Sequence, residues 1–211
     1  MTRLTSDLER IGETIRTNFT AKYEARDKAI KSSREAIFQC ASSIRAAHRG
    51  EYELAKSLAR AAKEILDKVN AAIAGNEDLR YTGFVHDAQK EYAEASITLA
   101  LVSGQPIPGP DDLGVVYSAY LNGLGEAAGE LRRHLLDTMR SGEMARCEDI
   151  LGMMDDIYSL LVTIDFPDAM TGGLKRTTDM VRGVLEKSRG DLTVALRQKQ
   201  LEAKLDAFGG K

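Results

Sequence analysis

Four glutamates occur as two closely spaced pairs, and carboxylates in this arrangement can hold a divalent metal ion. Glu91 and Glu94 are three residues apart, and Glu126 and Glu130 are four apart. At helical spacing each pair lies on one face of its helix. On a helical wheel Glu91 falls beside apolar residues. The second pair falls beside small residues that permit another element to approach closely.

Such pairs are costly unless something neutralises them. Like charges four residues apart destabilise a helix slightly, and burying an unpaired carboxylate destabilises the fold much more. A divalent cation would offset both costs. Because the ligands are hard carboxylate oxygens without paired histidines or a CxxC motif nearby, magnesium or manganese is favoured over zinc. A metal held in this way could activate water and stabilise the leaving oxygen at a scissile phosphate.

The same glutamates can also form ordinary solvated helix pairs. Glu94 could pair with Lys90, and Glu130 could pair with Arg133 or His134, at the spacings that bring side chains together on a helix. The spacing alone therefore leaves the metal site and the surface ion pairs open.

The elements that must position these glutamates are predicted to be helices. Apolar residues recur at three- and four-residue spacing and β-branched runs are few, which is typical of an all-α protein. The first helix is expected to bury one apolar stripe. We expect four helices over residues 6–48, 52–74, 77–102 and 115–140. A fifth helix is expected to be capped by Ser141, a sixth to start at Asp165 and Pro167, and a seventh to follow a break at Gly190–Asp191. The proline-rich segment 103–114 cannot be helical. Seven helices joined by short turns predict a bundle that forms one domain over residues 1–211.

Composition restricts the class of protein. Hydrophobic residues make up 43% of the 211 residues, enough for a sizeable core. The net charge of -3 argues against a purely electrostatic nucleic-acid binder but allows a local basic groove. Cys40 and Cys147 are expected to be buried thiols in a reducing compartment. The sequence shows neither a secretory signal nor an apolar run of about 20 residues, so we expect a cytoplasmic protein without a membrane segment.

Several segments resemble the translin family. The stretch QKEYAEA (residues 89–95), which follows Arg80-Tyr81, resembles the family's third-helix signature. The block YLNGLGEAAGELRR (residues 120–133) resembles its YLLG…GEL.R segment. The proline-rich loop, the end of the first helix at residues 45–50 and the segment Asp165-Phe166-Pro167 fall in register. The resemblance covers residues 32–195.

The resemblance implies a seven-helix bundle of the translin type that assembles into a hollow octamer and binds RNA or single-stranded DNA on its inner surface. One branch of the family only binds nucleic acid. The catalytic branch, TRAX (translin-associated factor X), is a magnesium-dependent endoribonuclease. Glu91, Glu94 and Glu130 match glutamates of the catalytic branch, whereas Glu126 stands where that branch usually has an aspartate, one methylene shorter. The resemblance thus implies a TRAX-like homo-oligomer with Mg²⁺ or Mn²⁺ at all four glutamates.

Cationic side chains near the glutamates are the expected phosphate contacts. Such contacts position a strand without reading its sequence and make binding depend on salt. The sequence has no RNP motif and no tryptophan, so sequence-specific readout is not expected. The candidates for nucleic-acid binding are Arg80, His86, Lys90, Arg133, Arg45, His48 and Arg49.

We therefore predict a metal-dependent endoribonuclease, with three alternatives from other classes. A non-catalytic translin-like protein would bind RNA or single-stranded DNA with structural carboxylates. An all-α nucleotide pyrophosphohydrolase also pairs an ExxE motif with a second acidic motif around magnesium, but it is usually shorter and has an aspartate in that second motif. A di-iron carboxylate bundle would need Glu-x-x-His twice, and the sequence contains no such motif.

Overall fold

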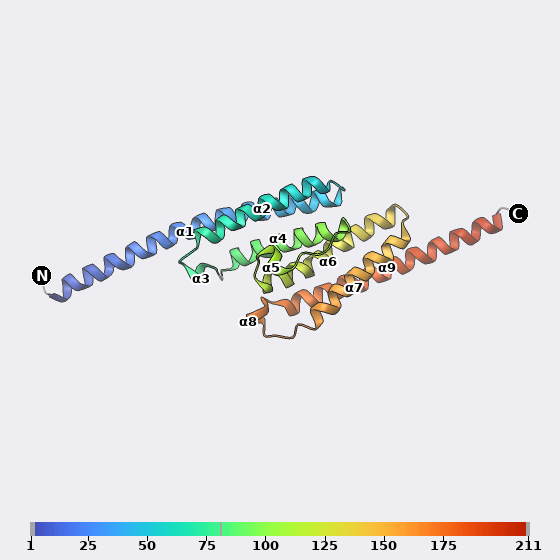
Figure 1. The fold of residues 1–211 in the computed structure, drawn as a ribbon. Helices are drawn as coiled ribbons and strands as arrows, with labels where there is room; N and C mark the ends of the chain where they lie inside the picture. The colour runs from blue at the N-terminus through green and yellow to red at the C-terminus, as the bar shows by residue number, and fades with distance from the viewer. Residues whose placement is uncertain (1–2, 81, 210–211) are drawn as a thin grey trace.

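The structure, a computed structural model, describes residues 3–80 and 82–209, and in these ranges it contains helices and no strand (Figure 1). The all-α prediction is confirmed. The helices are α1 (Arg3–His48), α2 (Tyr52–Ala72), α3 (Glu77–Arg80), α4 (Gly83–Val102), α5 (Pro110–Leu113), α6 (Tyr117–Arg140), α7 (Met144–Val162), α8 (Asp168–Thr171) and α9 (Leu174–Gly209). Among these described helices, none is long and apolar enough to cross a membrane.

The predicted break before the last helix is misplaced. The last helix does not begin after Gly190–Asp191, because α9 runs through both residues. A glycine inside a helix costs about 1 kcal/mol relative to alanine, and the burial of Ser188 and Leu192 on either side of the step offsets that cost. The break lies instead at Gly172 and Gly173, whose φ angles of 62° and 84° are in the left-handed region.

Two further boundaries differ from the sequence-based prediction. The expected helix over residues 77–102 is divided into α3 and α4. Ser141 does not cap the following helix: the N-cap of α7 is Glu143, where no side-chain cap hydrogen bond forms. The Ser141 hydroxyl lies 2.8 Å from the Thr138 carbonyl oxygen and 2.9 Å from Oε1 of Glu143. The proline-rich segment separates α4 from α6, but the prediction that it contains no helix is wrong at Pro110–Leu113. These residues form the short helix α5, because proline is tolerated in the first turn of a helix.

The bundle is arranged around α4 and α6. Helix α4 packs against α1, α2 and α6, and α6 also packs against α7 and α9. In Figure 1 the α1–α2 pair lies on one side of these central helices and α7 with α9 on the other. Ile97 of α4 and Leu131 and Leu135 of α6 are fully buried, as are the free thiols of Cys40 and Cys147. The glutamates on α4 and α6 are therefore carried by the two central helices of the bundle.

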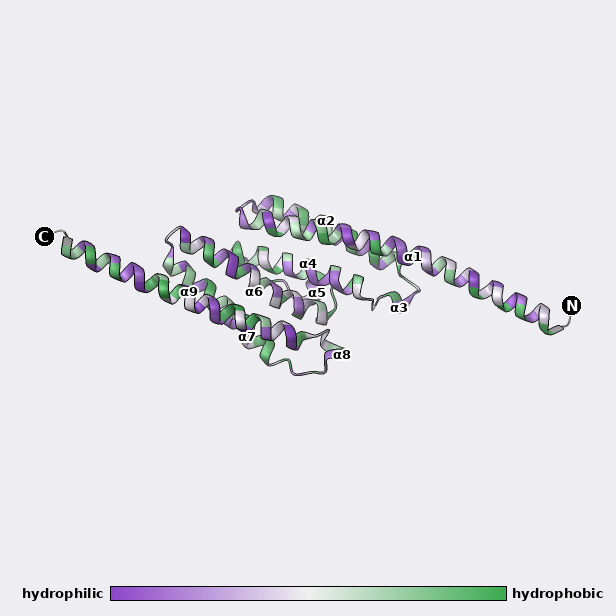
Figure 2. Ribbon diagram, turned by 180° about the vertical axis from the view of Figure 1, so that it is seen from behind, coloured by the Kyte–Doolittle hydropathy of each residue, from purple (hydrophilic) through white to green (hydrophobic). Residues whose placement is uncertain are grey.

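Both terminal helices extend beyond the bundle, in opposite directions, and carry exposed apolar side chains (Figures 1 and 2). The prediction that α1 buries one stripe along its length is wrong for its first half in the single chain, where burial begins only at Ala29. We call the exposed residues of α1 the N-terminal stripe: Leu4, Leu8, Ile11, Ile15, Phe19 and Tyr23. The C-terminal stripe on α9 consists of Val194, Leu201, Leu205 and Phe208.

Candidate metal centre and adjoining pocket

Helices α4 and α6 approach each other closely at Gly123. A methyl group on this residue would lie 2.6 Å from the carbonyl oxygen of Lys90 and 2.9 Å from the backbone nitrogen of Glu94. These contacts are too short for any side chain, so glycine is required at the crossing. The close approach brings the α4 residues 91 and 94 next to residue 126 of α6.

Three of the four predicted glutamates meet at this crossing. Carboxylate oxygens of Glu91, Glu94 and Glu126 lie within 4.8 Å of one another. Glu94 is only 8% exposed, whereas the other two are partly exposed. An octahedral magnesium ion holds its oxygen ligands at about 2.1 Å, so modest side-chain adjustment would bring all three oxygens to one ion. The donor set fits magnesium or manganese, both of which prefer carboxylate oxygens.

Burial and mutual repulsion make this cluster hold a proton. Burial, followed by the charges of Glu91 and Glu126, raises the pKa of Glu94 to about 8. Burial also raises the pKa of Glu91. The nearby Cys40 thiol has its pKa raised to about 12, first by burial and then by the charges of Glu91 and Glu94. A cation near these carboxylates would compete with the proton on Glu94.

The raised pKa of Glu94 predicts how stability depends on pH. Between its ordinary pKa of 4.5 and its folded value of about 8, the folded protein keeps a proton that the unfolded chain releases. Without divalent metal, the free energy of unfolding should therefore fall as pH rises through this window, by at most about 1.4 kcal/mol per pH unit. Urea denaturation in a chelator at several pH values measures the slope. The Glu94→Gln variant should show a flatter slope, and an unchanged slope would contradict this assignment.

Glu130, the fourth predicted ligand, contacts a histidine of α1. Its Oε2 lies 2.5 Å from Nε2 of His48, and the His48 side chain is only 3% exposed. This hydrogen bond holds the pKa of Glu130 below its ordinary value. Glu130 is not in the set whose oxygens lie within 4.8 Å, but its charge contributes to the raised pKa of Glu94. The pairing of Glu130 with Arg133 or His134, the surface alternative, is not what the structure shows.

Lys90 also has a different partner from the one that helical spacing suggested. Its Nζ atom lies 2.8 Å from Oε1 of Glu126 on the neighbouring helix and 3.7 Å from Oε1 of Glu91. No ion pair with Glu94 forms in the described part of the chain. Lys90 thus joins α4 to α6 across the face of the glutamate cluster.

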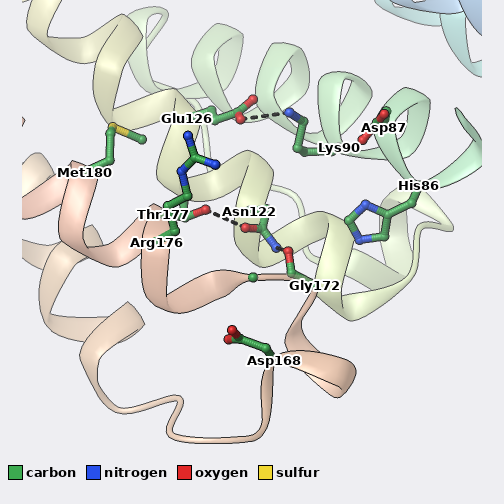
Figure 3. Close-up of a pocket in the computed structure, with 11 residues that line it drawn as sticks. His86, Asp87, Lys90, Asn122, Glu126, Asp168, Gly172, Arg176, Thr177 and Met180 are labelled. Carbon is green, nitrogen blue, oxygen red and sulfur yellow. Dashed lines mark hydrogen bonds and ion pairs between the residues drawn. The ribbon is translucent and has the colours of Figure 1, made fainter. Parts of the chain in front are cut away.

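A pocket of about 550 Å³ opens beside Lys90 and Glu126, between α4, α6 and the start of α9 (Figure 3). His86 and Lys90 line it from α4, as two of the predicted phosphate contacts. Arg176 lines it from α9 and was not predicted, because the sequence alone does not show that residue 176 lies beside α4 and α6. The residues that line the pocket are His86, Asp87, Lys90, Asn122, Glu126, Asp168, Gly172, Gly173, Arg176, Thr177 and Met180.

Asn122 joins the start of α9 to α6 and so fixes one wall of the pocket. Its side-chain amide donates to the Thr171 carbonyl oxygen at 2.8 Å, and the Thr177 hydroxyl donates to its Oδ1 at 2.5 Å. Asn122 is only 4% exposed. A buried polar group that loses its hydrogen-bond partner destabilises the fold. The hydrogen bonds of Asn122 therefore hold in place the segment that carries Arg176.

The other predicted cations whose side chains the structure describes do not line this pocket. Arg45 is exposed and contacts Ser42, and Arg49 is paired with Glu51 at 2.7 Å. Arg133 is exposed, and its charge contributes to the lowered pKa of Glu130. The side chain of Arg80 lies outside the described residues. Of the six predicted contacts whose side chains the structure describes, only His86 and Lys90 line the pocket.

Comparison with known proteins identifies the fold. No protein-family model matches the chain. AfC3PO, solved alone and in a complex with duplex RNA, is 31% identical, with a TM-score of 0.77 over 94% of this chain and 99% or more of that one. Apo-NeC3PO, at 20% identity, has a TM-score of 0.73 over 92% of this chain and 98% of its own. An uncharacterised protein of Methanocaldococcus jannaschii is 28% identical over 186 residues, 87% of this chain and 82% of that protein.

The helical bundle and its crossing of α4 and α6 therefore define an all-α protein with the architecture of the C3PO structures. At 31% identity over nearly the whole of AfC3PO, the chain belongs to the translin (C3PO) family. The predicted family and the translin-type fold are thereby confirmed. Membership of the TRAX-like catalytic branch stays a prediction.

Proposed function

We propose that this protein is a divalent-metal-dependent endoribonuclease of the TRAX-like branch. The convergence of Glu91, Glu94 and Glu126 beside a pocket that contains Lys90 and Arg176 carries the proposal. A hydrolase acting on RNA needs a metal near the scissile phosphate and cations that hold the strand. The complex of the related AfC3PO with duplex RNA supports a nucleic-acid partner.

In the proposed reaction, the carboxylates would bind the metal ion and the cations of the pocket would bind the strand. Magnesium or manganese held by the three carboxylates would supply Lewis acidity and an activated water. Lys90 from α4 and Arg176 from α9 would hold phosphate oxygens in the pocket (Figure 3). Because these contacts are to the backbone of the strand, RNA or single-stranded DNA would bind without sequence preference and more weakly at high salt.

The binding-only alternative also has an observation in its favour. Lys90 neutralises Glu126, and the raised pKa of Glu94 keeps that carboxyl protonated near neutral pH. The cluster can therefore be satisfied without a metal ion. On this alternative the protein binds RNA or single-stranded DNA and cleaves neither.

One experiment separates these functions. Purified protein is incubated with labelled single-stranded RNA and, separately, with a nucleoside triphosphate, each with magnesium or with a chelator. Cleavage of RNA in magnesium but not in chelator is the expected result. Binding of RNA without cleavage would establish the binding-only alternative, and release of pyrophosphate from the nucleotide would establish a pyrophosphohydrolase.

We also infer that the protein acts as a homo-oligomer, with an octamer as the predicted form. The N-terminal and C-terminal stripes leave large apolar side chains exposed on a single chain, and patches of this kind usually mark interfaces. Light scattering should give a mass several times 23.1 kDa. The double variant Ile11→Glu, Ile15→Glu should lower that mass, while Thr17→Glu, which adds a charge away from the stripe, should not. A wild-type mass of 23.1 kDa would contradict the inference.

A further inference from the structure

Lys90 contacts two of the three glutamates that form the candidate metal site. Its ammonium donates a hydrogen bond to Glu126 at 2.8 Å and lies 3.7 Å from Glu91. The side chain is 21% exposed and lines the pocket (Figure 3). One ammonium group therefore lies between the carboxylates that would bind a metal and the space that would hold a phosphate.

Arg176 is a second cation in the same pocket but has a different environment. It is exposed, and within the described residues it forms no ion pair. Figure 3 shows its guanidinium on the side of the pocket below Glu126 and Lys90. The pocket thus contains one cation held by a carboxylate of the cluster and one that is not.

We propose that Lys90 competes with the metal ion for Glu126 and, when the ion binds, is released to bind phosphate in the pocket. An ammonium group and a divalent ion on one carboxylate repel each other. Lysine suits this exchange because its charge is carried on a flexible four-carbon chain. The proposal rests on the proposed function only in requiring that the glutamates bind a metal.

The exchange would link metal binding to strand binding. Metal on Glu126 would free Lys90 for a phosphate, and a phosphate on Lys90 would free Glu126 for the metal. Because linkage is reciprocal, each ligand should raise the affinity for the other by the same factor. Arg176 should contribute affinity for the strand without contributing to this factor.

The first test measures metal affinity without RNA. Manganese is titrated into the intact protein by calorimetry, for the wild type, Lys90→Met, Lys90→Gln and Arg176→Met. Removing the competitor should tighten manganese binding by about 5- to 10-fold in both Lys90 variants, within the usual range of such couplings. Arg176→Met should stay within about twofold of the wild type. Unchanged or weaker manganese binding in the Lys90 variants would mean that Lys90 only positions Glu126, and the proposal would be wrong.

The second test measures the linkage itself. Anisotropy of a fluorescent single-stranded 2′-O-methyl oligonucleotide, chosen to resist cleavage, is followed with and without manganese. In the wild type manganese should tighten strand binding by about 5-fold or more. That factor should fall below about 2 in Lys90→Met and persist in Arg176→Met, which should bind the strand more weakly in both conditions. A factor that persists in Lys90→Met would overturn the proposal.

The outcomes distinguish this proposal from the proposed nuclease activity. If the linkage behaves as expected but wild-type protein leaves ordinary RNA intact in magnesium, the exchange at Lys90 stands and the nuclease proposal fails. If RNA is cleaved but Lys90→Met does not tighten manganese binding, only the exchange fails. Circular dichroism of each variant verifies that the helical fold is retained.

Discussion

Replacing Glu94 with glutamine is expected to reduce metal-dependent cleavage of RNA by at least about 100-fold, because losing even an outer-shell partner of a metal ligand costs about 10- to 100-fold. Glu94 is the most buried of the three converging glutamates. Glutamine keeps the shape of the side chain but cannot carry the negative charge that holds a cation. The rate of cleavage at saturating RNA and magnesium measures the effect.

A matched control uses the same chemical change at a different place. Glu53 on α2 is exposed and paired with Lys56, and it does not belong to the glutamate cluster. The Glu53→Gln variant should therefore cleave RNA at the wild-type rate. Binding of RNA by Glu94→Gln should be retained, since the substitution removes no cation from the pocket. If Glu94→Gln cleaves within a few-fold of the wild type, the three-glutamate cluster is not the catalytic centre.

Replacing Gly123 with alanine should lower the free energy of unfolding by about 1–3 kcal/mol, the usual cost of overfilling a packed core. The added methyl group would contact the backbone of α4 at Lys90 and Glu94, which cannot move aside as a flexible side chain could. Separating α4 from α6 would also spread Glu91 and Glu94 away from Glu126. We therefore expect weaker manganese binding together with lower stability.

Gly129 on the same helix provides the comparison. A methyl group there would have no neighbour within 4 Å, so Gly129→Ala should be neutral or should stabilise the helix by up to about 1 kcal/mol. Chemical denaturation in a chelator compares the two variants with the wild type, and calorimetry compares their affinity for manganese. Equal stability of the two variants would show that the crossing at Gly123 can relax to accept a side chain.

The helices could largely be predicted from the sequence because apolar spacing and turn residues are local signals. Where a helix boundary differs from the prediction, tertiary packing is the reason. Gly190 looked like a helix end, but buried neighbours keep α9 continuous there. The exposure of the N-terminal stripe could not be predicted either. Periodicity indicates which face of a helix is apolar, but it does not show whether that face is buried within one chain or between copies of the chain.

The candidate site was predictable only in part, for the same reason. The spacing of Glu91 and Glu94, and the small residues around Glu126, indicated that carboxylates could converge but left surface ion pairs open, and the family resemblance favoured the metal site. The partner of Glu130 was not, because His48 lies 82 residues away along the chain. Arg176 and the hydrogen bonds of Asn122 depend on how α9 packs on α6. Contacts between segments that are distant in the sequence can be identified only once the fold is known.

Helix α9 belongs both to the pocket and to the outer end of the molecule. Arg176 lies in its first turn, and Leu205, 29 residues further on, belongs to the C-terminal stripe. At 1.5 Å per residue, the two positions are about 44 Å apart along one rod. Because α9 has no break that could absorb a twist, rotating its outer end about the axis rotates the pocket end with it. A copy of the chain seated on the C-terminal stripe would therefore set the angle at which Arg176 faces a strand, and the geometry of the pocket would be a property of the assembly.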